Sequence, residues 1–176
     1  MRVGLASTIS NAKGIGRLKM TWHTITATTS AEIPAQAAVI YDIIADYRNG
    51  HPRILPPEHF TFLEVDGGGR GAGTRIRFGM KGFGRVTTYR GTVSEPLPGR
   101  VLRERLDEGL VTSYLIEPLG PDLTRTTIVT VYLRSGLRGL IERLLVPPFL
   151  RKVYDAELML LAREAAAAST ERNNAA

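Results

Sequence analysis

The sequence predicts an α+β fold in which a curved antiparallel sheet of seven strands wraps around one long C-terminal helix, with two short helices between strands one and two. Two patterns carry this prediction. Residues 60–133 are rich in Thr, Val, Tyr, Phe and Arg and are interrupted by Gly and Pro, whereas residues 136–169 are rich in Leu and Ala. A sheet that curves around a helix buries both apolar faces and tends to enclose a pocket, so the layout indicates a binding function.

The first predicted elements are one strand and two short helices. Residues 23–33 alternate with a period of two and contain many threonines, which is typical of a strand. Pro34 suits the first position of a helix, and apolar residues at helical spacing across residues 39–44 predict an amphipathic helix that ends near Gly50. The prolines within residues 51–57 limit the next segment to a turn or a single helical turn.

Six consecutive strands are predicted next, separated by turns that contain Gly, Pro or Asp. The clearest alternation places Ile76 and Phe78 on one face and Arg75 and Arg77 on the other, so one face should be buried and the other solvated. The predicted strands are residues 60–65, 74–80, 85–93, 100–106, 110–119 and 124–133.

The spacing of apolar residues becomes helical from Leu137 onward, and the resulting stripe is expected to cover the sheet. Pro147 and Pro148 interrupt this pattern and predict a kink or a break in the helix, with the ligand site beneath it. Residues 169–176 are expected to form a disordered polar tail.

Composition narrows the classes of function. The net charge is +6, but residues 1–20 hold four basic residues and no acid, so the remainder carries only +2. Arginines are dispersed within that remainder, which argues against a nucleic-acid surface. We interpret residues 1–20 as a disordered leader or as the product of a start site assigned too far upstream.

Three further absences bear on location and chemistry. No apolar run reaches the length that a membrane-spanning helix needs, so no integral membrane segment is expected. The sequence has no Cys, which excludes disulfides and thiolate sites and fits a cytoplasmic protein. The three histidines lack metal-ligand spacing, so neither a metal nor a cofactor is expected. We expect a monomer or a homodimer.

Several short motifs resemble the START-like (SRPBCC) superfamily of the polyketide cyclase/dehydrase and lipid-transport type. They are Ile33-Pro34-Ala35 leading into residues 39–46, the glycine-rich turn followed by Gly73-Thr74, and the Glu-Pro pairs at residues 95–96 and 117–118. The resemblance spans residues 21–168 and implies a helix-grip fold with an internal ligand cavity. It also implies a ligand such as a sterol, lipid, polyketide, hormone or quinone, and it leaves open whether the cavity catalyses a reaction.

The candidate ligand-binding residues are mostly aromatic or ionisable side chains predicted to face this cavity. An aromatic ring supplies an apolar wall and a tyrosine hydroxyl adds one orienting hydrogen bond, although ordinary core tyrosines explain the same pattern. The candidates are Tyr47, His51, Arg53, Phe78, Tyr89, Glu104, Tyr114, Tyr132 and Tyr154.

Two of these candidates carry most of the predicted chemistry. His51 follows the first helices, where it could bind the polar end of a ligand, or it could be a surface histidine in a proline-rich loop. Glu104 alternates with Leu102 and Leu106; if that face is concave, its carboxyl projects into an apolar cavity and its pKa rises. The alternative is an edge-strand residue that pairs with an arginine.

Two functions follow as hypotheses. The first is binding or transport of a small hydrophobic or amphipathic molecule, such as a lipid, polyketide, quinone or aromatic compound, in an internal cavity. The alternative is a polyketide cyclase or dehydratase that uses Tyr, His and Glu side chains for proton transfer in the same cavity.

Overall fold

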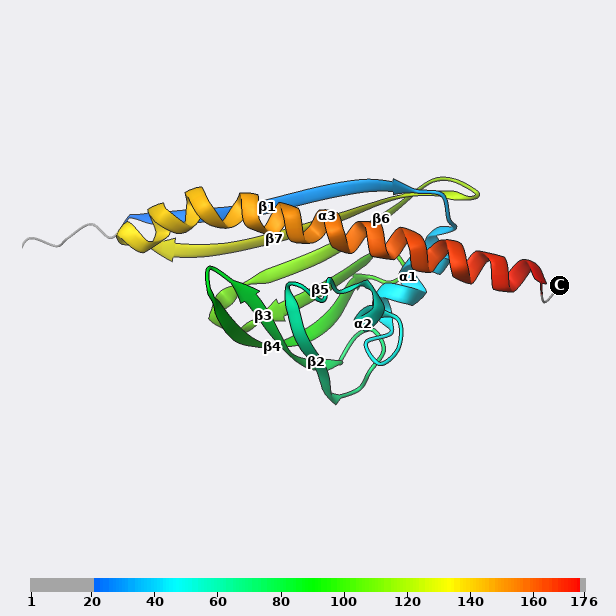
Figure 1. The fold of residues 1–176 in the computed structure, drawn as a ribbon, viewed down its shortest axis with the longest axis horizontal. Helices are drawn as coiled ribbons and strands as arrows, with labels where there is room; N and C mark the ends of the chain where they lie inside the picture. Colours follow the sequence, from blue (N-terminus) through cyan, green and yellow to red (C-terminus); the bar gives the residue numbers. More distant parts are fainter. Residues whose placement is uncertain (1–20, 175–176) are drawn as a thin grey trace, which may run out of the picture.

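The computed structural model describes residues 21–174, which form one sheet of seven strands, two short helices and one long helix (Figure 1). The predicted leader, residues 1–20, lies outside the described part of the chain. The elements in chain order are β1 (Trp22–Ile33), α1 (Ala37–Ala45), α2 (His51–Ile54), β2 (Phe60–Gly67), β3 (Arg75–Gly82), β4 (Arg85–Leu97), β5 (Val101–Leu106), the short 3-10 turn η1 (Asp107–Gly109), β6 (Val111–Gly120), β7 (Leu123–Ser135) and α3 (Gly136–Asn174).

The sheet is antiparallel throughout, with the strand order β1-β7-β6-β5-β4-β3-β2. Consecutive strands from β2 to β7 are neighbours, and α1 and α2 carry the chain from β1 at one edge to β2 at the other. Figure 1 shows the sheet curving below α3, which runs along β1 and β7. This arrangement confirms the predicted helix-grip fold.

Several strands extend beyond their predicted ends, and the largest extension is in β4. β4 was expected to end at Val93, but it continues through Pro96 to Leu97. The pairing of β4 with β5 shifts register between Ser94 and Leu97. A bulge of this kind accommodates a residue without a backbone N–H, which explains why Pro96 does not end the strand.

The long helix differs from the prediction in two respects. It continues through Pro147 and Pro148, which excludes the break that was one of the two predicted alternatives, and it extends to Asn174, where a tail from residue 169 was expected. A proline within a helix removes one hydrogen bond to the carbonyl four residues earlier, here at Arg143 and Leu144. Both of those residues are exposed, so water can reach the carbonyls that lose their helical donor.

The two halves of α3 are buried to different extents. In the second half, Val153, Leu161 and Ala165 are buried in the core, as the apolar stripe predicts. In the first half, Leu137 and Leu144 are 72% and 66% exposed, so the expectation that the whole stripe covers the sheet was wrong. Ile141 and Leu145 in this half line the cavity described below, whereas Leu137 and Leu144 face solvent.

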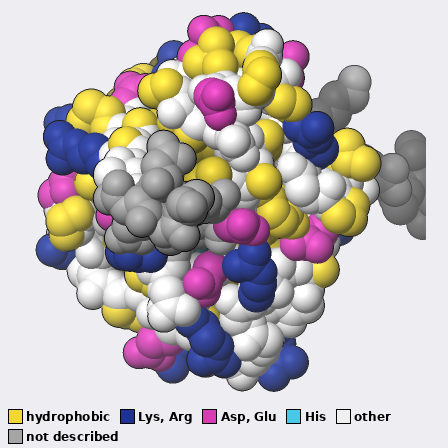
Figure 2. All heavy atoms as spheres, turned by 90° about the vertical axis from the view of Figure 1, so that its right-hand side faces the viewer, with side chains coloured by type: hydrophobic (Ala, Val, Ile, Leu, Met, Phe, Trp, Pro, Cys, Tyr) yellow, Lys and Arg dark blue, Asp and Glu magenta, His cyan; other side chains and the backbone are white. Residues whose placement is uncertain are grey.

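The charged surface agrees with the dispersed arginines of the sequence. On the face at the C-terminal end of α3, acidic and basic side chains are interspersed and no continuous basic surface is visible (Figure 2). Over residues 21–174, none of the helices combines the length and the apolar character needed to cross a bilayer.

Candidate functional site

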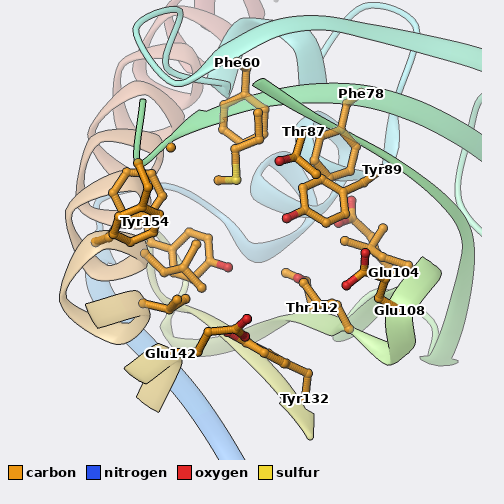
Figure 3. A pocket seen from close by; sticks show the side chains of 18 of the residues that line it. Phe60, Phe78, Thr87, Tyr89, Glu104, Glu108, Thr112, Tyr132, Glu142 and Tyr154 are labelled. Carbon is orange, nitrogen blue, oxygen red and sulfur yellow. The ribbon is translucent and has the colours of Figure 1, made fainter. Parts of the chain in front are cut away.

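A cavity of about 400 Å³ lies between the concave face of the sheet and α3. Its volume falls within the range of roughly 300–1,000 Å³ that is usual for small-molecule sites. Figure 3 shows side chains from several strands and from α3 converging on this space. Apolar members of its wall include Phe60, Leu63, Ile76, Phe78, Met80, Tyr89, Leu106, Leu110, Val146, Phe149 and Leu150.

Strand pairing places the aromatic part of the wall. Phe78 on β3 lies opposite Tyr89 on β4, and both side chains point into the cavity with ring centroids 5.5 Å apart. Phe60 on β2 continues the row, with its ring centroid 5.8 Å from that of Phe78. Side chains of facing residues on adjacent strands lie on the same side of a sheet, so this aromatic row follows from the register.

Glu104 on β5 is the first ionisable group of the cavity wall. It is 5% exposed, and the hydroxyl of Tyr47 donates a hydrogen bond of 2.6 Å to its Oε1. Burial disfavours the carboxylate and raises the pKa of Glu104 to about 7, although the hydrogen bond from Tyr47 opposes this rise. The Leu102–Leu106 face is therefore the concave one, and the alternative of an edge carboxylate paired with arginine is excluded.

Glu157 on α3 is a second buried carboxyl in the same wall. The hydroxyl of Tyr114 on β6 donates a hydrogen bond of 2.7 Å to its Oε1. Burial raises the pKa of Glu157 to about 8; the Tyr114 hydrogen bond opposes this rise, and the negative charge of Glu104 adds to it.

The sequence analysis missed Glu157, yet a signal was present. In an α-helix, positions three and four residues apart share a face. Glu157 lies three residues after Tyr154 and four before Leu161, both of which are buried. An ionisable residue on the apolar face of the long helix could have been recognised from this spacing alone.

His51 at the start of α2 lies beside Glu104 and not in a surface loop. It is 3% exposed, and its Nδ1 lies 2.8 Å from the carbonyl oxygen of Ile44. A carbonyl only accepts hydrogen bonds, so Nδ1 carries the proton and Nε2, 3.8 Å from Glu104 Oε1, is the free nitrogen of the neutral ring. Burial lowers the pKa of His51 to about 4, so the ring is neutral near pH ~7.

Ring contacts join these groups into one network. The His51 ring stacks on Tyr47 at 4.3 Å between centroids and meets Tyr114 edge-on at 5.6 Å. The network therefore runs from Glu104 through Tyr47, His51 and Tyr114 to Glu157, and it joins residues from β5, α2, β6 and α3. We call these five residues the carboxyl network.

Three hydroxyl groups that are hydrogen-bonded in series lie next to the carboxyl network. The Tyr154 hydroxyl is 2.5 Å from Thr130 Oγ1, which is 2.6 Å from Thr112 Oγ1. Both Thr112 and Tyr154 line the cavity, and Figure 3 shows them on different walls. This chain gives the cavity neutral hydrogen-bonding groups in addition to the two carboxyls.

The mouth of the cavity carries both basic and acidic side chains, and these pair with one another. Arg134 Nη2 lies 2.5 Å from Glu108 Oε2, and Arg138 Nε lies 2.6 Å from Glu142 Oε1. All four residues belong to the cavity lining. Tyr132 lies on the same side, and burial together with the charge of Glu142 raises its pKa above the ordinary value.

The structure places seven of the nine candidate residues in the cavity wall. Tyr47 lies behind the wall, where it acts on Glu104. Arg53 was placed wrongly: its exposed side chain pairs with Glu164 on α3, with 3.3 Å between Nε and Oε2. The seven lining candidates are His51, Phe78, Tyr89, Glu104, Tyr114, Tyr132 and Tyr154.

The ionisable groups of the wall suit proton transfer and hydrogen bonding better than metal binding. In the part of the chain from residue 21 to 174, no three His, Cys, Asp or Glu side chains gather as metal ligands would. A carboxyl with a pKa near neutrality can both give and accept a proton, and either form can bind a polar group of a ligand.

Solved structures with the same fold support this assignment of the architecture. The KanY protein, solved by NMR, shares 25% identity with this chain at a TM-score of 0.71, and the match covers 81% of this chain and 98% of that one. The Zhui aromatase/cyclase from Streptomyces sp. R1128 shares 17% identity at a TM-score of 0.63, covering 82% of this chain and 94% of that one. A START superfamily protein from Mycobacterium smegmatis shares 18% identity at a TM-score of 0.56, covering 79% and 92%.

No curated protein matches the chain. The family model described as polyketide cyclase / dehydrase and lipid transport matches residues 24–166, which include every strand from β2 to β7 and all of the cavity wall. The chain therefore belongs to the polyketide cyclase / dehydrase and lipid transport family.

Proposed function

We propose that the protein binds a small, predominantly apolar molecule in the cavity between the sheet and α3. The observation that carries this proposal is the cavity of about 400 Å³ within the core, walled mainly by aromatic and aliphatic side chains. Protein interiors pack closely, and a large internal space lowers stability unless it has a use. A few polar groups in a mostly apolar wall are typical of sites that bind and orient small molecules.

The rim of the cavity supports entry of an apolar ligand. Phe83 at the β3–β4 turn and Leu145 on α3 both line the cavity and are 62% and 54% exposed. The Phe83 ring lies 5.1 Å from that of Phe149 on α3, so the turn and the helix meet at the rim. Apolar side chains exposed beside an apolar cavity give a ligand a continuous path from the surface.

The family supports the same proposal. Its description covers both catalysis and lipid transport, and enclosing a small molecule is common to the two. The Streptomyces protein is named an aromatase/cyclase, but at 17% identity its likeness extends to the fold alone. Binding is therefore the function that the cavity of this chain supports best.

A fluorescent probe tests the proposal with a matched pair of variants. N-phenylnaphthylamine brightens in apolar surroundings, and we expect saturable enhancement with the wild type. Thr87 on β4 lines the cavity, so Thr87→Trp should fill part of it and weaken binding by at least roughly tenfold. Thr88→Trp places the same side chain on the exposed face of β4 and should bind as the wild type does. No saturable enhancement, or equal loss in both variants, would count against the proposal.

A second candidate function is acid–base catalysis on a polyketide-like substrate. Glu104 favours it, because its pKa of about 7 lets it exchange protons near neutrality, and the free Nε2 of His51 lies 3.8 Å away. Incubation with a poly-β-keto thioester should then yield a cyclised product that has lost water. Glu104→Gln should slow its formation by at least roughly a hundredfold. Equal product formation with and without the protein would remove this candidate.

A further inference from the structure

Two carboxyls share the wall of one cavity without a cation from the protein. Glu104 and Glu157 are 5% and 1% exposed, and they reach the cavity from opposite sides, β5 and α3. Burying even one ionised carboxyl is costly unless it is paired with a positive charge. Without such a charge a buried carboxyl keeps its proton, and a cation that a ligand brings into the cavity would favour its ionised form.

The groups that face these carboxyls are neutral. Glu104 meets the Tyr47 hydroxyl and the His51 ring, and Glu157 meets the Tyr114 hydroxyl. Each hydrogen bond uses Oε1, and within residues 21–174 the Oε2 of neither carboxyl has a hydrogen-bond partner. Each carboxyl therefore offers one oxygen to whatever occupies the cavity.

The positive charges of the cavity wall lie at its mouth and have partners there or in solvent. Arg134 pairs with Glu108, and Arg138 pairs with Glu142, while Arg85 at the start of β4 is exposed. None of these guanidinium groups forms an ion pair with Glu104 or Glu157 in the described chain. The interior end of the cavity thus holds two carboxyl groups and no arginine or lysine of the described residues, whereas arginines and glutamates occur together at the mouth.

We propose that the ligand is an apolar or aromatic molecule that carries a protonated amine, with its ammonium group bound between Glu104 and Glu157. This inference rests on the proposed binding function and names its ligand class. An ammonium group donates up to three hydrogen bonds and has no acceptor, which matches two free carboxyl oxygens. The aromatic rings of Tyr114 and Tyr154 beside them favour a cation as well. The apolar remainder of the ligand would occupy the space toward Phe78 and Tyr89.

The proposal has a thermodynamic signature, because a cation favours the ionised form of a carboxyl. Binding of the ammonium should therefore release a proton to solvent from whichever carboxyl becomes ionised. A neutral ligand has no such effect. Proton release is measured by calorimetry in two buffers with different enthalpies of ionisation, and it does not depend on any variant.

Three probes with the same hydrocarbon test the ligand class: naphthylmethylamine, naphthylmethanol and naphthylacetate. At a pH of about 7.5 we expect the amine to bind at least roughly tenfold more tightly than the alcohol, and the carboxylate to bind weakest. The preference for amine over alcohol should shrink as the pH falls below ~6, because both carboxyls then hold their protons. Proton release should accompany the amine alone.

Variants assign the preference to the two carboxyls. Glu104→Gln and Glu157→Gln keep the side-chain shape, and each should lower the ratio of amine affinity to alcohol affinity toward one. Glu117→Gln, on the exposed face of β6, is the control and should behave as the wild type. Thermal unfolding of each variant checks that it is folded.

The outcomes separate this inference from the proposed function. If the alcohol binds in the cavity but the amine has no advantage and releases no proton, the ligand class is wrong and the binding function stands. If the preference survives both glutamine substitutions, the ammonium binds elsewhere and the inference fails. If none of the probes binds, the proposed binding function is contradicted as well.

Discussion

Within residues 21–174, Glu104 and Glu157 form no ion pair with an arginine or a lysine. Surface acids such as Glu32 and Glu117 pair with Arg125, whereas the two cavity acids accept hydrogen bonds from tyrosines. A tyrosine hydroxyl stabilises a buried carboxylate less than a cation does. The pKa values of both cavity acids therefore lie well above the ordinary value for glutamate, to about 7 and about 8.

These raised pKa values make stability depend on pH. In the unfolded chain both carboxyls are already ionised near neutrality, while the folded protein retains their protons until the pH passes about 7 and about 8. The folded state then binds more protons, so the free energy of unfolding should fall by roughly 1–2 kcal/mol between pH ~7 and ~8.5. His51, with a pKa lowered to about 4, is neutral in the folded protein, and in the unfolded chain it is largely neutral above pH ~7, so its opposite contribution is small.

Urea denaturation at the two pH values measures this dependence. Glu157→Gln should flatten most of it, because Glu157 has the higher pKa of the two acids. Glu117→Gln on the surface should leave it unchanged. A wild type that gains stability over this interval, or a Glu157→Gln variant with the same slope, would show that Glu157 does not hold a proton in the folded state.

Sequence alone identified Glu104 but not Glu157, and it misplaced Arg53. Glu104 was found because a strand has a period of two, so its leucine neighbours at 102 and 106 fix the direction of its side chain. Arg53 belongs to a helix of four residues, His51–Ile54, which is too short for a period to show which side faces the core. Its exposure and its pairing with Glu164 depend on tertiary contacts that no local pattern records.

At the scale of elements, α3 combines two segments with different surroundings. Up to Leu145 its leucines are largely exposed, whereas from Leu150 onward one face is buried against β1, β7 and the short helices. Pro147 and Pro148 separate the two segments and remove the helical donors for Arg143 and Leu144. The periodicity predicted a helix in both segments, but burial depends on where the sheet curves away, which the pattern does not encode.

This difference predicts unequal local stability along one helix. Amides of residues 140–146 should exchange with solvent at least roughly tenfold faster than those of residues 153–165, because fewer buried contacts hold the first segment. Hydrogen exchange monitored by NMR measures this directly. Pro148 is exposed, so Pro148→Ala should return a helical N–H without disturbing the core and should narrow the difference. Equal exchange along the whole helix would show that the first segment is as firmly held as the second.

Gly139 fixes how closely the first turns of α3 approach the end of β7. A methyl group there would lie 2.6 Å from the carbonyl oxygen of Arg134, which is backbone and cannot move aside easily. We therefore expect Gly139→Ala to displace the start of α3 and to lower the free energy of unfolding by roughly 1–3 kcal/mol. Gly84, at the β3–β4 turn, has open space around the same position. Its left-handed backbone alone should make Gly84→Ala unfavourable, by about 1 kcal/mol. Chemical denaturation of both variants distinguishes the steric effect from the conformational one; equal losses would contradict the steric account.

At the scale of the whole molecule, the order of segments was sufficient to predict the fold. One strand, two short helices, six strands and a long helix admit few ways to bury every apolar face, and the helix-grip arrangement is the one observed. The alternation within β3 also predicted that Ile76 and Phe78 lie on the buried face. The cavity volume could not be predicted in this way, since it depends on how far the first half of α3 stands from the sheet.

The central claim is that a small apolar molecule binds in this cavity, and NMR of methyl-labelled protein tests it most directly. On titration with N-phenylnaphthylamine, the methyl resonances of Ile76, Leu106 and Leu110 in the cavity wall should shift and saturate together. Those of Ile40, which lies in the core outside the wall, and of Leu119, exposed at the end of β6, should not move. Shifts confined to exposed residues such as Leu119, with the three wall residues unchanged at saturating probe, would contradict the claim.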